Sequence, residues 1–209
     1  MYKQFKQIVY RLLIPLIRIY KYLNWRIYLL TADEINLVVG AGPTKFRGWF
    51  STDIVTLDVT KESDFKKYFS KKKIHKVLAE HVLEHLTNSD LDLMAANLFK
   101  YSEENVNIRI AVPDGFHSNV DYINIVKPGG TGEGAEDHKN LFTVISLSEI
   151  FERSGFKSHP VEYWDKDGKF HQGYKNNENG YVIRSFLNDK RNQNGNPVYT
   201  SLIIDFKKN

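Results

Sequence analysis

The chain has 209 residues, of which 42% are hydrophobic and 13% aromatic, so we expect one folded domain with its own core and exclude a disordered chain. It contains no cysteine, which excludes disulfides, thiolate metal sites and a cysteine nucleophile. The net charge of +4 is uneven, because residues 1–30 carry six basic and no acidic side chains and the remainder is slightly acidic.

The basic N-terminal stretch has the pattern of an amphipathic helix that is kinked or interrupted near Pro15. Its uncharged run at residues 12–17 is far too short to cross a bilayer, and the stretch lacks the apolar middle and cleavage site of a signal peptide. Such a helix can pack on the rest of the chain or lie on an anionic membrane surface. We predict an N-terminal segment 1–30 and a domain 31–209, in the cytoplasm or peripheral at the inner membrane face.

From residue 33 onward, segments with strand patterns alternate with segments that have helical patterns. The expected strands are residues 34–42, 48–54, 55–60, 74–81, 106–115 and 199–207, and the expected helices are residues 62–70, 89–102 and 146–156. A turn signal at Asp167 and Gly168 also predicts a hairpin. This alternation predicts an α/β fold with a Rossmann-like, parallel-dominated sheet and helices on both faces.

Ligands of such sheets lie beyond the carboxyl ends of the strands, so the residues that follow each strand are candidates for a site. Gly40, Ala41 and Gly42 form a turn after the first expected strand, where the lack of side chains lets the backbone approach a ligand. Lys45 stands where the dinucleotide fingerprint requires glycine, and the P-loop pattern is absent. The turn therefore predicts close backbone contact with a ligand without defining which one.

Acidic residues follow the next two expected strands. A carboxylate at Asp53 can accept hydrogen bonds from two ribose hydroxyls, and Asp58 with the N–H of Val59 could read an adenine edge. The stretch around Asp58 also fits the start of a helix, and both interpretations can hold together. Further polar residues follow the later strands: Glu80, His81 and Asp114.

Residues 79–87, AEHVLEHLT, also match the H-x-x-E-H pattern of inverted zinc peptidases through His81, Glu84 and His85. A zinc site needs both histidines one turn apart on a helix and a further ligand, such as Glu149 or Glu152. The preceding strand instead places His81 at a strand end. We therefore interpret this stretch as a pocket wall, with Glu84 and His85 in structural roles, and predict no metal ligand.

The succession INLVVGAGPTKFRGWFSTDI, VLAEHVLEHLT and IRIAVPDGFHS resembles the class I S-adenosylmethionine-dependent methyltransferases, and more narrowly bacterial members tied to surface-polysaccharide synthesis. Later pieces such as KPGGTGEGAEDHKNLFT and YTSLIIDF are similar too, so the resemblance covers about residues 33–207. It implies S-adenosylmethionine as the cofactor. The residues that it places around the cofactor are Gly40, Ala41 and Gly42 at the methionine part, Asp53 at the ribose, Asp58 and Val59 by the adenine, and Glu80 and His81 near the methyl group.

A sugar hydroxyl as methyl acceptor would require a general base, because its pKa is high. Three places offer one: Asp114 with His117 after a strand, Asp137 with His138 in a glycine-rich stretch, and His81. That glycine-rich stretch is interpreted as a loop that closes over the acceptor, with a flexible linker as the alternative. The sequence does not decide among these bases.

We therefore predict a methyltransferase that O-methylates a sugar hydroxyl in a glycan or glycan precursor, with a saccharide or saccharide-linked acceptor as its partner. A zinc-dependent hydrolase built on His81 and His85 is one alternative. A non-catalytic cofactor-binding subunit is another, because Val38 replaces the acidic or amide residue that the family has two places before the first glycine of the turn. Nucleic acid is not expected, since the chain beyond residue 30 is slightly acidic.

Overall fold

The structure is a computed structural model that describes residues 2–42, 44–192 and 194–208, with side chains described from residue 14 onward. Its elements are, in chain order, α1 (Tyr2–Thr31), β1 (Ile35–Val39), β2 (Phe50–Ser51), α2 (Glu62–Phe69), β3 (Ile74–Glu80), η1 (Leu83–His85), α3 (Asn88–Tyr101), β4 (Ser102–Pro113), α4 (Val120–Val126), η2 (Ala135–Asp137), α5 (Val144–Glu152), β5 (Phe156–Trp164), β6 (Phe170–Gln172), η3 (Lys190–Asn192) and β7 (Ser201–Lys208).

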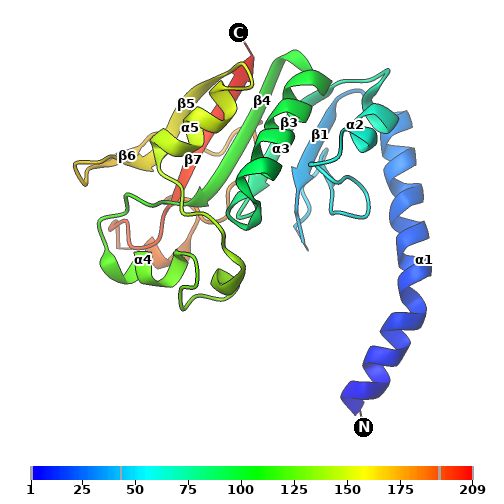
Figure 1. The fold of residues 1–209 in the computed structure, drawn as a ribbon, viewed down its shortest axis with the longest axis horizontal. Coiled ribbons are helices and arrows are strands. Elements are labelled where there is room, and N and C mark those ends of the chain that lie inside the picture. The colour runs from blue at the N-terminus through cyan, green and yellow to red at the C-terminus, as the bar shows by residue number, and fades with distance from the viewer. Residues whose placement is uncertain (1, 43, 193, 209) are drawn as a thin grey trace.

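Seven strands form one sheet in the order β2-β1-β3-β4-β7-β5-β6 (Figure 1). The strands β2, β1, β3 and β4 are parallel, and β7, β5 and β6 continue the sheet with antiparallel pairs. Val39 lies opposite Ala79, which lies opposite Ile110, so β1, β3 and β4 end at one edge of the sheet. The predicted α/β fold with a Rossmann-like sheet is confirmed.

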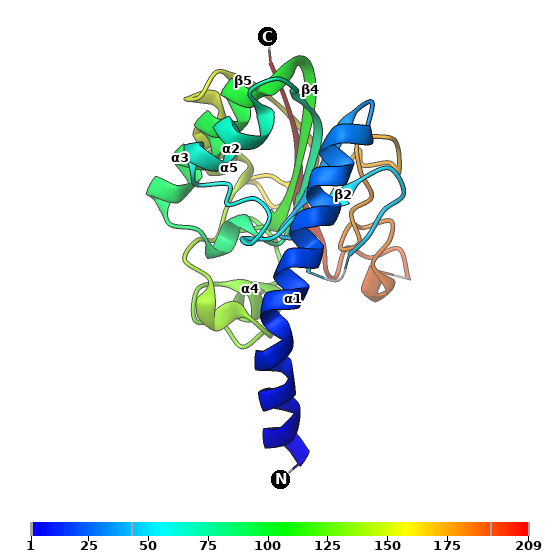
Figure 2. The ribbon, with the colours of Figure 1, turned by 90° about the vertical axis from the view of Figure 1, so that its right-hand side faces the viewer.

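The main core lies on the face of the sheet that carries α2, α3 and α5 (Figure 2). Alternate strand residues such as Leu37, Val77 and Ile108 point to this face and are fully buried. A capping box starts α3, with Thr87 as the cap and Asp90 as its partner. The three helices thus cover this face of the sheet.

The other face of the sheet is covered less regularly than predicted. Val38 and Leu78 point to this face and pack against Tyr174 and Val182, which belong to the segment 173–200. Among the described residues of that segment, η3 is the only helical piece, so irregular chain replaces the helices predicted for this face. We call residues 173–200 the covering segment.

A buried ion pair fixes the covering segment to the sheet. Arg109 of β4 donates two hydrogen bonds of 2.7 Å to the carboxylate of Asp205 on β7. The same guanidinium donates to the side-chain oxygen of Asn177 at 3.0 Å and to the carbonyl of Gly180 at 2.8 Å. Because Arg109 and Asp205 are buried, the hydrogen bonds of the guanidinium specify where the segment crosses the sheet.

Helix α1 is continuous through Pro15, so the interruption predicted there is absent. Its C-terminal part packs on the domain through Trp25, which is fully buried and contacts the rings of Phe50 and Phe69 at centroid distances of 4.8 and 6.0 Å. The N-terminal part projects beyond the domain (Figures 1 and 2). Within the part of the chain that the structure describes, none of the helices combines the length and the hydropathy that a bilayer span requires.

The strand predicted at residues 55–60 is wrong, because the chain forms successive turns there. The carboxylate of Asp53 accepts hydrogen bonds from the N–H groups of Val55 and Thr56, and Asp58 accepts one from the N–H of Thr60. Such local bonds between an aspartate side chain and the following backbone compete with extended pairing.

Candidate functional site

The turn after β1 is built for close approach of a ligand. Gly40 and Gly42 have φ angles of 60° and 52°, in the left-handed region that glycine adopts without strain. A Cβ on Gly40 would lie 2.6 Å from Val82, so a side chain there would collide with the neighbouring loop. Together with Ala41, the turn lines a cavity of about 320 Å³ at the carboxyl edge of the sheet, which we call the small cavity.

Asp53 lies beside this turn but not in the wall of the small cavity. The preceding residue, Thr52, donates its N–H to the carbonyl of Val38 and accepts the N–H of Ala41, so the end of β2 is tied to the turn. The carboxylate of Asp53 pairs with Lys21 of α1. Although partial burial raises the pKa of Asp53, the bond from Lys21 and the turn N–H groups bring it below its ordinary value.

Asp58 and Val59 also lie outside the small cavity. Asp58 pairs with Lys61 at 2.9 Å and bonds Thr60, while Val59 is buried in the main core and accepts a hydrogen bond from Asn97 through its carbonyl. These contacts hold the loop before α2. The adenine contact predicted for the two residues stays a prediction.

Glu80 and His81 at the end of β3 both line the small cavity. The carboxylate of Glu80 accepts the backbone N–H groups of Ile183 and Arg184 at 3.0 and 2.7 Å. Through these bonds the covering segment crosses the carboxyl end of β3 and forms the outer wall of the cavity. Sequence reasoning did not assign Ile183 and Arg184 to the site, because they follow no strand.

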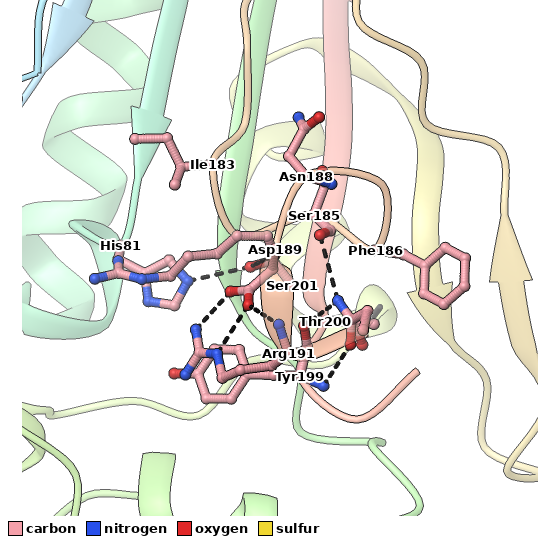
Figure 3. A network of polar contacts seen from close by, with 12 residues as sticks. His81, Ile183, Ser185, Phe186, Asn188, Asp189, Arg191, Tyr199, Thr200 and Ser201 are labelled. Atoms are coloured by element: carbon pink, nitrogen blue, oxygen red, sulfur yellow. Dashed lines mark hydrogen bonds and ion pairs between the residues drawn. The ribbon is translucent and has the colours of Figure 1, made fainter. Parts of the chain in front are cut away.

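His81 is the one described residue other than glycine with a positive φ, 53°. A non-glycine residue in this region is strained, and such residues concentrate at functional sites. Its N–H continues the ladder to the carbonyl of Ala111 at 2.8 Å, and its Nε2 lies 3.1 Å from Oγ of Ser201 (Figure 3). The surrounding structure therefore holds the imidazole in a fixed position.

A second cavity, of about 680 Å³, opens on the other side of His81, and we call it the large cavity. His81 and Arg184 line both cavities, so the two meet at these residues. Arg191 and Tyr199 approach from the covering segment, on the same side as Ser201 (Figure 3). The remaining polar residues of its wall are Glu84, His85, Asn119, Asp121, Tyr122, Glu133 and His138.

Glu84 is fully buried although it is acidic, and its carboxylate faces imidazole rings. Oε1 lies 3.2 Å from Nδ1 of His81 and 4.0 Å from Nε2 of His138, yet neither carboxylate oxygen has a well-formed hydrogen bond. Burial raises the pKa of Glu84, but the bond and charge of His81, together with smaller effects of the backbone and of His85, bring the pKa below its usual value. The prediction gave Glu84 only a structural role, whereas the structure also places it in the wall of the large cavity.

The geometry required by the zinc-hydrolase alternative is absent. His81 ends a strand in a left-handed conformation, and His85 belongs to the 3-10 helix η1. The two imidazoles therefore do not share one face of an α-helix, because no α-helix spans them. The ring of His85 instead lies against that of His138, with centroids 4.8 Å apart.

Of the four predicted catalytic residues, the structure places only His138 in the wall of a cavity. Asp137 precedes His138 in the sequence, but its side chain is exposed and does not belong to the wall of the large cavity. The carboxylate of Asp114 is buried and accepts the N–H groups of Trp164 at 2.7 Å and Phe116 at 3.0 Å. Burial outweighs these bonds and raises its pKa to about 6. Its contacts fit a role in joining β4 to β5.

His117 lies beside Asp114 in the same packed region. Its ring stacks on Tyr122 at 4.0 Å and contacts Trp164 at 4.8 Å, and Nδ1 accepts the N–H of Asn119. Burial lowers its pKa to about 4, so the imidazole is neutral at pH 7. These contacts fit a structural role for His117, and neither Asp114 nor His117 belongs to the wall of either cavity.

The strand order and the two cavities at the carboxyl edge define a Rossmann-like α/β protein with a ligand site at the usual edge. No protein-family model and no curated protein matches the chain. Similar solved structures exist, and the likeness extends over most of the chain.

A SAM-dependent methyltransferase from Archaeoglobus fulgidus is similar over 91% of this chain and 94% of its own, at 19% identity and a TM-score of 0.48. One from Anabaena variabilis covers 92% and 95%, at 8% identity and a TM-score of 0.47. Magnesium protoporphyrin IX methyltransferase from Synechocystis, with bound SAH, covers 89% and 80%, at 9% identity and a TM-score of 0.43. Because these values are low, the function has to follow from the residues of this chain.

Proposed function

We propose that the chain is an S-adenosylmethionine-dependent methyltransferase whose donor occupies the small cavity and whose acceptor occupies the large one. The observation that carries the proposal is that the two cavities meet at His81, just beyond the end of β3. Group transfer needs two ligands held side by side with water kept out. The covering segment supplies the outer wall for both ligands through Arg184.

The donor side suits an adenosyl ligand that carries an amino acid. The turn at Gly40 leaves room for close contact with backbone, and the cavity volume of about 320 Å³ lies at the lower end of the range for small-molecule sites. The adenosine part would extend along the end of β2 toward Asp53. Binding of ribose there requires Asp53 to exchange Lys21 for hydroxyl donors.

The acceptor side supports a hydroxyl compound rich in polar groups, such as a saccharide. Its wall combines hydrogen-bonding side chains with the ring of Tyr199, on which the guanidinium of Arg191 stacks at 3.2 Å. S-adenosylmethionine supplies an electrophilic methyl group: its sulfur keeps the electron pair of the broken bond to carbon, and the acceptor oxygen forms the new one. The hydroxyl proton leaves toward the imidazole of His81, which lies beside the carboxylate of Glu84 and lines the large cavity.

Calorimetry with S-adenosylhomocysteine tests the proposal. We expect micromolar binding, on the order of −8 kcal/mol, that is largely lost in Gly40→Ala because the new Cβ collides with Val82. Gly168→Ala is the matched control, since Gly168 also has a positive φ, 76°, but open space around it.

Asp53→Ala tests the ribose contact separately, and Asp92→Ala, which removes an exposed partner of Arg153, is its control. We expect Asp53→Ala to weaken binding at least tenfold and Asp92→Ala to leave it unchanged. If S-adenosylhomocysteine gave no heat of binding with the wild-type chain, the proposed function would be contradicted.

We further propose that α1 places the enzyme on an anionic membrane surface. Six apolar side chains that recur every three or four residues are each more than half exposed, on the side opposite Trp25: Leu16, Ile19, Tyr20, Leu23, Ile27 and Leu30. Residues 1–30 carry six basic side chains and no acidic one. An apolar stripe with basic surroundings matches an anionic lipid surface.

Co-sedimentation with vesicles tests this second proposal. Vesicles that contain phosphatidylserine should bind the full chain, neutral vesicles should bind it much less, and Leu23→Glu with Ile27→Glu should abolish binding. Leu93→Glu, on the exposed surface of α3, is the control. Equal binding of both vesicle types, or a concentration-dependent dimer that the double substitution disrupts, would contradict the membrane proposal.

A further inference from the structure

We infer that Glu84, His85 and His138 bind a divalent transition-metal ion in the wall of the large cavity. Each of the three offers a ligand atom, and these atoms all lie within 4.8 Å of one another. One carboxylate and two imidazoles form a donor set that suits ions of intermediate softness, such as Zn²⁺, Co²⁺, Mn²⁺ or Fe²⁺. The three residues leave further coordination positions open toward the cavity.

The orientation of His138 is that of a metal ligand. Its Nδ1 lies 2.7 Å from the carbonyl oxygen of Val126, and because a carbonyl only accepts, Nδ1 must carry the hydrogen. Neutral His138 therefore presents the lone pair of Nε2, which faces Oε1 of Glu84 at 4.0 Å. Two acceptors that face each other without a proton between them repel, and a cation between them removes the repulsion. Histidine ligands of metals are typically held in this way by a backbone carbonyl.

The buried carboxylate of Glu84 needs a cation for a second reason. Both of its oxygens are buried and lack a hydrogen-bond donor. His81 does not remove the need when it is neutral, because Oγ of Ser201 donates to the carbonyl of Arg184 and so accepts from Nε2 of His81. Nδ1 of His81 then also presents a lone pair to Glu84, at 3.2 Å. A divalent ion would balance the carboxylate and satisfy its oxygens.

The two segments that carry the three ligands are fixed to each other. The carbonyl of Glu84 accepts the N–H groups of Lys139 and Asn140 at 2.7 and 3.2 Å, and the side chain of Asn140 donates to the carbonyl of Leu86 at 2.7 Å. The glycine-rich stretch reaches His85 through Gly134, whose φ is 83°. Tetrahedral binding at about 2.1 Å places ligand atoms ~3.4 Å apart, so ligand atoms that lie within 4.8 Å of one another have to approach by roughly 1 Å.

The position of the ion in the large cavity indicates that it would activate the acceptor, and this assignment rests on the proposed function. An ion held by Glu84 and His138 lies on the acceptor side of His81. A hydroxyl oxygen of the acceptor that occupied an open coordination position would lose its proton more readily, because the positive charge stabilises the alkoxide, and His81, which is not a ligand of the ion, would accept the proton. The metal site would thus meet the requirement for activating a hydroxyl of high pKa, and it would bind the acceptor in a fixed orientation.

Titration of the full chain with Co²⁺ tests the site without any methyl-transfer assay. We expect one equivalent of Co²⁺ to bind, with visible absorption bands that Zn²⁺ abolishes and Mg²⁺ does not. Glu84→Gln should weaken binding at least 100-fold and His85→Ala at least tenfold. His171→Ala is the matched control, because His171 also lies beside a carboxylate, that of Asp165 at 2.7 Å, but the pair is partly exposed and outside the large cavity.

Absence of Co²⁺ bands in the wild type, or binding that neither Glu84→Gln nor His85→Ala weakens, would overturn the metal site. If Glu84→Gln does not fold, which circular dichroism detects, His85→Ala decides alone, because its side chain is half-buried. Calorimetry with S-adenosylhomocysteine on the metal-free protein separates the two proposals. Binding of S-adenosylhomocysteine without binding of Co²⁺ overturns the metal site only. Binding of Co²⁺ without binding of S-adenosylhomocysteine overturns the methyltransferase proposal only.

Discussion

At the scale of single residues, the site depends on conformations that few residue types tolerate. His81 adopts a left-handed φ of 53° at the junction of two cavities, and Gly40 has no room for a Cβ. The conformation of His81 costs stability in isolation and is held by neighbouring contacts such as the hydrogen bond from its N–H to the carbonyl of Ala111. The chemistry of the site is thus tied to two positions where the sheet ends and the following loop turns sharply.

A second feature at this scale is a pair of buried acids outside the cavities. Glu162 is fully buried on β5, and burial raises its pKa from 4.5 to about 8, against the bond from the N–H of Phe186. Asp114, whose pKa is about 6, adds to the repulsion of a charged Glu162. Near neutral pH the folded protein therefore binds protons that the unfolded chain has lost.

This pattern predicts that the free energy of unfolding falls as the pH rises. Because the pKa of Glu162 is raised on folding, its stabilising contribution is complete below about pH 4.5 and is lost as the pH passes 8. We expect the free energy of unfolding to drop by about 2–4 kcal/mol from pH 5.5 to pH 8.5, with a limiting slope of about 1.4 kcal/mol per pH unit for one group. Urea titrations at several pH values measure the drop.

Glu162→Gln should flatten this dependence, because the amide has a similar shape and no proton to lose. Glu152→Gln, on the exposed end of α5, is the control and should leave the dependence as in the wild type. An unchanged slope in Glu162→Gln would show that Glu162 is not protonated in the folded protein.

At the scale of elements, the sequence predicts the parallel half of the sheet well. The strands that end near Gly40, His81 and Asp114 are found where their apolar patterns place them, because a strand buried on both faces needs a nearly continuous apolar run. The turns at residues 55–60 escape prediction, because aspartate side chains there bond the backbone that an expected strand would have used. Local composition could not separate these two outcomes.

The covering segment is the largest element that the sequence does not reveal. Its residues have no periodicity, and its position depends on contacts with strands that are far away in the chain, such as that between Gly180 and Arg109. Of the two residues that line both cavities, His81 could therefore be predicted from the sequence and Arg184 could not. His138 was one of the candidate bases that the sequence offered, and it lies in the wall of the large cavity, whereas its proximity to Glu84 required the folded structure.

The anchor of the covering segment predicts a large effect on stability. Arg109→Ala should lower the free energy of unfolding by about 3–5 kcal/mol, because it leaves the buried carboxylate of Asp205 without its partner. Arg153→Ala removes an ion pair with Asp92 of similar length, 2.6 Å, on the exposed surface, and should cost less than about 1 kcal/mol. Denaturant unfolding of both variants measures the difference, and equal losses would contradict the anchoring role of Arg109.

At the scale of the whole molecule, different parts of the fold have different roles at the site. The parallel strands and helices α2, α3 and α5 hold the edge residues in place, and the covering segment closes the site from the other side (Figure 2). Helix α1 contacts the candidate site through the ion pair between Lys21 and Asp53. The stripe of exposed apolar side chains on the opposite side of α1 is available for contact with another surface. A membrane-bound α1 would therefore hold the carboxyl edge of the sheet at a defined distance from the lipid.

The position of S-adenosylhomocysteine in a crystal structure of the complex tests the division between donor and acceptor cavities most directly. We expect its amino-acid part at the turn of Gly40, its adenosine toward Asp53, and its sulfur beside His81 at the opening into the large cavity. Density for the ligand on another face of the sheet, or in the large cavity against Glu84 and His138, would contradict this arrangement.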